Sequence, residues 1–197
     1  GWHYRIKNTI VELDSKAEHN AQIRREADTS GLISASGFTL YYDSTNNPSN
    51  PTEGFKSRFD FEYIGLGGIH TYFGLAYINQ YFVPIGKNGV IKYRADFRFL
   101  NPIGHTTAST IPIDERLFLG GDSSIRGYRS YRIGPRFIDS DDPSGGLSSQ
   151  LYSIEYAHRY NNRLEPFLFF DAGHLSDDKW EFAVPRAAIG FGARVKL

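Results

Sequence analysis

Residues 55–63, Phe55-Lys-Ser-Arg-Phe-Asp-Phe-Glu-Tyr63, alternate between apolar and charged side chains, with Ser57 the one polar residue on the apolar side. The segments 91–99 and 186–197 repeat this alternation. Successive side chains of an extended strand point to opposite faces of a sheet, so the pattern predicts strands with one apolar and one polar face. Five weaker segments bring the prediction to about eight antiparallel strands. They lie near 2–10, 31–43, 69–83, 152–159 and 163–174.

Residues rich in Gly, Pro and Asn separate these segments, as expected of turns. Residues 14–30 are polar, and their Thr, Ser and Asn favour a loop over a helical turn. The connection at about 103–148 is much longer than the connections usual in a compact domain, which indicates that it has a function.

The composition excludes several classes of protein. The 197 residues contain no Cys, which rules out a disulfide framework or a thiolate metal site. The 22 basic and 22 acidic residues cancel, so no charge field predicts nucleic acid as a partner. The chain contains no Met and starts at Gly1, from which we expect a segment of a longer or processed protein.

The alternation fits two architectures. In a soluble β-sandwich the apolar faces would pack on each other, and periodicity alone does not reject that alternative. Several predicted strands run for about 10–13 residues, however, whereas soluble strands have about 5–6 and spanning a bilayer takes about 9–11. Aromatic residues form 15% of the chain and crowd the apolar faces. Both features favour an all-β, antiparallel transmembrane barrel with aromatic girdles.

The long connection contains Arg116-Leu-Phe-Leu-Gly-Gly-Asp-Ser-Ser-Ile-Arg-Gly-Tyr128, and Tyr131-Arg-Ile-Gly-Pro-Arg136 follows. This resembles the signature loop of the BamA-like (bacterial surface antigen) superfamily of outer-membrane assembly factors, with one residue fewer before the paired glycines. The positions that match this loop motif are Phe118, Gly120, Gly121, Gly134 and Pro135. Collinear matches in the hairpin of 42–55 and in strands 169–173 and 189–192 extend the resemblance over roughly 31–197.

The resemblance implies a partial outer-membrane β-barrel domain over 1–197, with about eight of sixteen strands and a lumenal loop at about 103–148. It implies a factor that folds and inserts β-barrel proteins in the outer membrane of a Gram-negative-type bacterium. The expected partners are outer-membrane lipid, nascent outer-membrane proteins and, through domains outside this chain, accessory periplasmic lipoproteins. We expect no enzymatic activity, no cofactor and no metal site.

In that family the loop folds back into the barrel lumen, where an arginine at its tip meets acidic residues of the wall. By position, the resemblance makes Arg126, Gly127 and Tyr128 the loop anchor and Asp171 and Glu155 its partners on the lumen wall. Strand alternation also points both carboxylates inward. Taken without the family, Arg126 is better interpreted as an ordinary solvated loop charge. Gly127 would let the backbone pass close to the wall or adopt a positive φ.

Two related functions stay open as alternatives. A two-partner secretion pore shares the Arg-Gly-Tyr loop and the barrel but exports one extended substrate. The translocation and assembly module factor is closer, because its loop also favours Ser-Ile-Arg-Gly-Tyr, as in 124–128. A closed barrel of eight strands would be too narrow to hold the long connection. We therefore expect either that the connection lies outside such a barrel or that the chain works with further strands.

Overall fold

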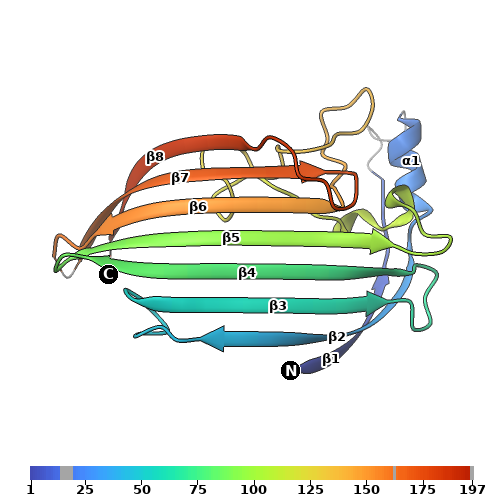
Figure 1. The fold of residues 1–197 in the computed structure, drawn as a ribbon. Helices are drawn as coiled ribbons and strands as arrows, with labels where there is room; N and C mark the ends of the chain where they lie inside the picture. Colours follow the sequence, from blue (N-terminus) through green and yellow to red (C-terminus); the bar gives the residue numbers. More distant parts are fainter. Residues whose placement is uncertain (14–19, 162, 196–197) are drawn as a thin grey trace.

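The computed structural model describes residues 1–13, 20–161 and 163–195. Its eight strands form one antiparallel sheet in which each strand pairs with its neighbours in the chain, which confirms the predicted fold class (Figure 1). The strands are β1 (Trp2–Thr9), β2 (Gly31–Asp43), β3 (Gly54–Ile64), β4 (Tyr72–Ile85), β5 (Gly89–Pro102), β6 (Ser148–His158), β7 (Leu164–Ser176) and β8 (Arg186–Val195). Within the described residues β1 and β8 are the two edges of the sheet, so the barrel is not closed.

The outer face of the sheet is apolar and uncovered over most of its area. Its exposed aromatic and aliphatic side chains include Phe191 and Ile189, each 84% exposed. Cross-strand aromatic pairs such as Phe59 and Tyr77, whose ring centroids are 6.5 Å apart, line this face. The described residues contain no second sheet to cover it. The soluble sandwich is therefore wrong for this chain, since that architecture needs two sheets packed face to face.

The strands are long enough for a barrel that crosses a membrane. β4 and β5 each contain 14 residues, above the roughly 9–11 that a tilted strand needs to span the hydrocarbon region. In the part of the chain that the structure describes, no helix has the length and apolar character of a membrane-spanning helix.

The connection from β5 to β6, residues 103–147, lies on the concave inner side of the curled sheet (Figure 1). Ile111 and Ile125 of this connection are fully buried against inward side chains of the strands. The inner face was predicted to be polar. Where the connection covers this face the prediction is wrong, because the inward residues beneath the connection are apolar. They are Ile33, Ala35, Ile64, Leu100, Leu151 and Leu175.

A short helix, α1 (Ala21–Ala27), occupies part of the segment predicted to be a loop. Asn20, one of the residues that favoured the loop, accepts hydrogen bonds from the backbone of Gln22 and Ile23 and caps the helix. The rest of that prediction, over 14–19, falls outside the described residues, as do the last two residues of the alternating segment 186–197.

Candidate functional site

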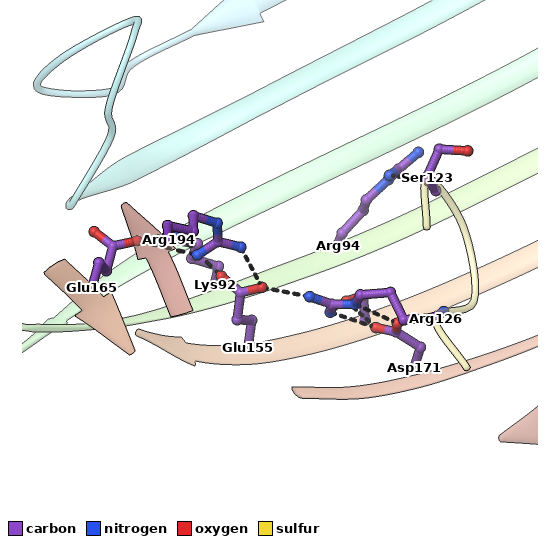
Figure 2. A network of polar contacts seen from close by, with 9 residues as sticks. Lys92, Arg94, Ser123, Arg126, Glu155, Glu165, Asp171 and Arg194 are labelled. Carbon is purple, nitrogen blue, oxygen red and sulfur yellow. Dashed lines mark hydrogen bonds and ion pairs between the residues drawn. The ribbon is translucent and has the colours of Figure 1, made fainter. Parts of the chain in front are cut away.

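Arg126 lies at the tip of the long connection and contacts the inner wall of the sheet. Its Nε and Nη2 atoms donate to the two carboxylate oxygens of Asp171 on β7, at 2.7 and 2.8 Å, and its backbone N–H donates to the same group at 3.1 Å. Its Nη1 donates to Glu155 on β6 at 2.7 Å (Figure 2). The planar guanidinium thus uses its fork on two carboxylates at once, which a Lys ammonium cannot reproduce.

Glu155 connects the loop tip to the rest of the wall. Besides Arg126, it accepts from Arg194 of β8 at 2.7 Å and from Lys92 of β5 at 3.2 Å. Arg194 also donates to Glu165, at 3.1 Å. Sequence reasoning had found neither cation. Both stand on polar faces of their strands, but only the register of the sheet brings them to the same carboxylate.

An aromatic platform supports the two arginines. The Arg126 guanidinium lies 3.8 Å from the ring centroid of Phe169, and that of Arg194 lies 4.2 Å from the centroid of Phe167. Both rings lie across β8, where Gly190 and Gly192 are the register partners. A Cβ at either glycine would come within 2.6 Å of the ring above it. The Phe-x-Phe and Gly-x-Gly patterns of adjacent strands are a sequence signal that could have predicted this platform.

Water reaches one side of this network. A hollow of about 420 Å³ opens between the tip and the wall, and Arg126 retains 19% of its side-chain exposure, whereas Asp171 has none. Arg94 of β5 borders the hollow and donates to the backbone oxygen of Ser123 at 3.2 Å, a further contact between wall and tip. The ion pair is therefore partly desolvated, a condition in which removing one partner is costly.

The remaining motif residues shape the connection instead of meeting the carboxylates. Gly127 has a φ of +86°, and a Cβ there would lie 3.6 Å from that of Ala188, so this position requires backbone freedom and not close approach. The Tyr128 hydroxyl donates to the Ala187 backbone oxygen at 3.2 Å. Phe118 packs on Tyr131, with ring centroids 5.1 Å apart. The other four residues of the predicted motif, Gly120, Gly121, Gly134 and Pro135, make no contact with Asp171 or Glu155 that the structure records.

The base of the same connection carries a second attachment to the wall. Glu115, in the 3₁₀ turn η3 (Ile113–Glu115), accepts from both Nη atoms of Arg5 on β1, at 2.8 and 2.9 Å. Lys7 of β1 and Tyr72 of β4 also donate to it, at 3.0 and 3.1 Å. Burial alone pushes the pKa of Glu115 upward, but these hydrogen bonds outweigh it and hold that pKa below its ordinary value.

A third contact joins the connection to α1. The Nη2 atom of Arg116 donates to both carboxylate oxygens of Glu26, at 2.8 and 2.9 Å, and the two side chains are only 6% and 7% exposed. Arg116 also donates to the backbone oxygens of Ile111 and Ser144. Burial raises the pKa of Glu26 above its ordinary value, and the opposing effect of Arg116 is smaller. Glu26 and Arg116 are ninety positions apart in the chain, and sequence reasoning missed this pair.

Among the described residues, no group of three or more His, Asp or Glu side chains is placed to hold a metal ion. The charged groups of the site are instead paired with one another. The chemistry that the arrangement supports is attachment: the long loop is fixed to the sheet at its tip and near its base, and to α1 by a third contact.

An open antiparallel sheet of long strands, with an apolar outer face and a connection fixed to its inner face, has the architecture of a section of a transmembrane β-barrel. The chain belongs to the Omp85 superfamily, whose domain matches residues 1–197.

The chain is also similar to individual proteins. The chain is 29% identical to "Outer membrane protein assembly factor BamA" of Nitratidesulfovibrio vulgaris, over 92% of this chain and 23% of the relative. It is 26% identical to "SAM50-like protein CG7639" of Drosophila melanogaster, over 84% of this chain and 38% of the relative. The chain thus spans between about a quarter and two fifths of these relatives.

The fold also matches a solved structure. A crystal structure of BamA from Haemophilus ducreyi lacking POTRA domains 1–3 superposes with a TM-score of 0.68 at 18% identity. The match covers 84% of this chain and 36% of that one. It therefore supports the barrel architecture of the strands described above.

Proposed function

We propose that the chain is part of the barrel of an outer-membrane protein assembly factor, which folds and inserts β-barrel proteins into the outer membrane. The identity of 29% with the Nitratidesulfovibrio vulgaris assembly factor, over 92% of this chain, carries the proposal. The network of carboxylates and cations described above supports it, because it consists of contacts that attach the long connection to the inner wall of the sheet. The factor acts without enzymatic chemistry of its own.

Within that factor, Arg126, Gly127 and Tyr128 form the anchor that holds the long connection in the barrel lumen. Asp171 and Glu155 are its partners on the lumen wall. The paired hydrogen bonds from Arg126 to both carboxylates support this role. An anchored connection keeps the lumen in one shape while the substrate folds at the barrel, whereas a loose connection would leave the inner wall exposed.

The proposed location is the outer membrane of a Gram-negative-type bacterium, with nascent outer-membrane proteins and lipid as partners. Accessory periplasmic lipoproteins would bind through parts of the protein beyond these residues. A relative in Drosophila melanogaster means that such sequences are not confined to bacteria. Cell fractionation with an antibody to the full-length protein distinguishes a bacterial outer membrane from a mitochondrial one.

An insertion assay tests the proposal. The full-length protein is reconstituted in phospholipid vesicles, an unfolded outer-membrane protein is added, and its folding is followed by heat-modifiable gel mobility. We expect folding faster than in empty vesicles, with most of the acceleration lost in Arg126→Ala and retained in Arg136→Ala. Arg136 is a matched control because it pairs with Asp141 at 2.7 Å in the same connection but is far more exposed.

Two outcomes would contradict the proposal. Equal folding rates in vesicles with and without the full-length protein would contradict the insertion function. Export of an extended substrate across the vesicle membrane, without insertion of barrels, would favour the two-partner secretion alternative. Equal activity of the two arginine variants would remove the proposed role of the anchor while leaving the assembly function intact.

A further inference from the structure

The connection from β7 to β8, residues 177–185, folds back over the outer face of the sheet (Figure 1). The indole of Trp180 stacks on Phe99 of β5, with ring centroids 4.5 Å apart and an interplanar angle of 24°. Phe182 contacts the same ring at 5.9 Å. The segment therefore crosses β6 to reach β5, and Phe99 is left only 8% exposed. We call residues 177–185 the outer strap.

The outer strap covers polar side chains that point toward the apolar side of the sheet. Ser148 and Gln150 on β6 and Ser176 on β7 alternate in phase with the outward apolar residues of their strands, yet all three are at most 5% exposed. The Ser148 hydroxyl donates to the Asp178 backbone oxygen at 2.9 Å, and the Gln150 amide donates to that of Glu181 at 2.5 Å. The Ser176 hydroxyl donates to the Glu181 carboxylate.

These contacts satisfy hydrogen-bonding groups that would otherwise face outward on an apolar surface. A polar group exposed to hydrocarbon without a partner is strongly disfavoured, and water cannot reach it there. Three side chains of the sheet are thus each paired with the strap, and the polar patch is closed from the outside.

The outer strap exposes three apolar side chains beside the charged residues Asp177, Asp178 and Lys179. Trp180, Phe182 and Val184 are 43%, 64% and 88% exposed. They continue the exposed outer surface formed by neighbours such as Tyr152 and Phe170, which are 39% and 45% exposed. Lys179 precedes Trp180 directly. A Trp beside a cationic residue at the end of a membrane strand is typical of the boundary between acyl chains and headgroups.

We propose that the outer strap is a lipid-contacting element, which seals the polar patch of β6 and β7 and places Trp180 and Phe182 in the interfacial region of the membrane. This inference rests on the proposed membrane location of the barrel. The occupant at its exposed apolar side chains is lipid, because these side chains extend the apolar outer face of the sheet. Projection into water would leave its three apolar side chains hydrated, which is unfavourable.

Depth-dependent fluorescence quenching tests the proposal on the full-length protein in phosphatidylcholine vesicles. The emission of Trp180 is obtained as the difference between the parent protein and Trp180→Phe, so tryptophans elsewhere cancel. Lipids brominated at a shallow acyl position should quench most of this difference emission, and aqueous iodide should quench little of it. The difference between the parent and Trp2→Phe serves as the control, because Trp2 stands on the outer side of β1 and is 74% exposed.

The outcomes separate the outer strap from the membrane location itself. Bromolipid quenching of both Trp180 and Trp2 supports the proposal. Quenching of Trp2 alone, with Trp180 open to iodide, overturns the proposal for the strap while the barrel stays in the membrane. Iodide quenching of both residues overturns the membrane location and the strap together.

A second pair of variants tests the contribution to membrane insertion. Phe182→Ser should lower the fraction of protein that becomes heat-modifiable in vesicles, and Ile138→Ser should leave that fraction unchanged. The two side chains are equally exposed, at 64%, but Ile138 belongs to the connection on the inner side. Equal behaviour of the two variants would count against a lipid contact at Phe182.

Discussion

Arg116 and Arg126 belong to the same connection, and each pairs with a buried carboxylate. Arg126 attaches the connection to the sheet, whereas Arg116 attaches it to α1. Arg126 crosses to the wall of the sheet, where two strands present Asp171 and Glu155 beside an open hollow. Arg116 pairs with Glu26 of α1, away from the sheet and almost fully buried. The first contact fixes the loop to the inner wall of the sheet, while the second holds two connections to each other. We therefore expect the burial of each pair to determine the loss of stability, and the position of its partner to determine the loss of assembly activity.

The largest loss of stability is expected from Arg116→Met. It leaves the Glu26 carboxylate buried without its cation, which costs about 3–5 kcal/mol for pairs of this kind. Urea unfolding of the full-length protein in vesicles measures the free energy of unfolding. The double variant Arg116→Met/Glu26→Leu should recover much of the loss, since an apolar pair has no charge to desolvate. A double variant as unstable as the single one would show that the ion pair is not the source.

Arg126→Ala should cost less stability, about 2 kcal/mol, because water in the hollow partly solvates the carboxylates that it leaves behind. Its effect on assembly activity should nevertheless exceed that of Arg116→Met. Arg126→Lys should fall between the parent and Arg126→Ala, because an ammonium cannot span Asp171 and Glu155 as a fork does. A Lys variant with full activity would contradict the importance of the paired geometry.

The two loop carboxylates should respond to pH with opposite signs. The pKa of Glu115 is lowered from 4.5, so its contribution to stability is complete above that value and is lost as pH falls through the folded pKa. The pKa of Glu26 is raised from 4.5, so its contribution is complete below that value and is lost as pH rises through the folded pKa. Unfolding free energies measured from acid to neutral pH test this.

Two variants show which carboxylate causes each pH-dependent loss of stability. Glu115→Gln should flatten the acid-side loss, and Glu26→Gln should flatten the loss on the neutral side, each by about 1.4 kcal/mol for every unit of pKa shift. If both variants changed the pH dependence of the unfolding free energy in the same direction, the opposite pKa shifts of Glu115 and Glu26 would be wrong.

Gly127→Ala should destabilise the tip by about 1 kcal/mol, because a side chain at a φ of +86° is strained although space is available. The smallest effect is expected at Arg136, whose pair with Asp141 is exposed to solvent. Arg136→Ala should change the free energy of unfolding by less than about 0.5 kcal/mol. A larger change would mean that solvent exposure does not predict how much each of these arginines contributes to stability.

The sequence by itself determined the strands and most of their faces, because alternation is a local property of neighbouring residues. It placed Asp171 and Glu155 on the inner side for the same reason, and the resemblance of 116–136 supplied Arg126 as the group to look for. The range 31–43 agrees with β2 to the residue, whereas other ranges, such as 69–83 for β4, differ from the structure by a few residues.

Only the tertiary structure decided which side chains meet across the chain. The pair of Arg116 and Glu26, the attachment of Glu115 to Arg5, and the outer strap all join residues whose separation carries no periodic signal. The helix α1 formed within a polar segment because Asn20 capped it and Glu26 found a buried cation. Such contacts depend on how the sheet curls and where the long connection folds, and those are properties of the whole chain, whereas alternation depends on neighbouring residues alone.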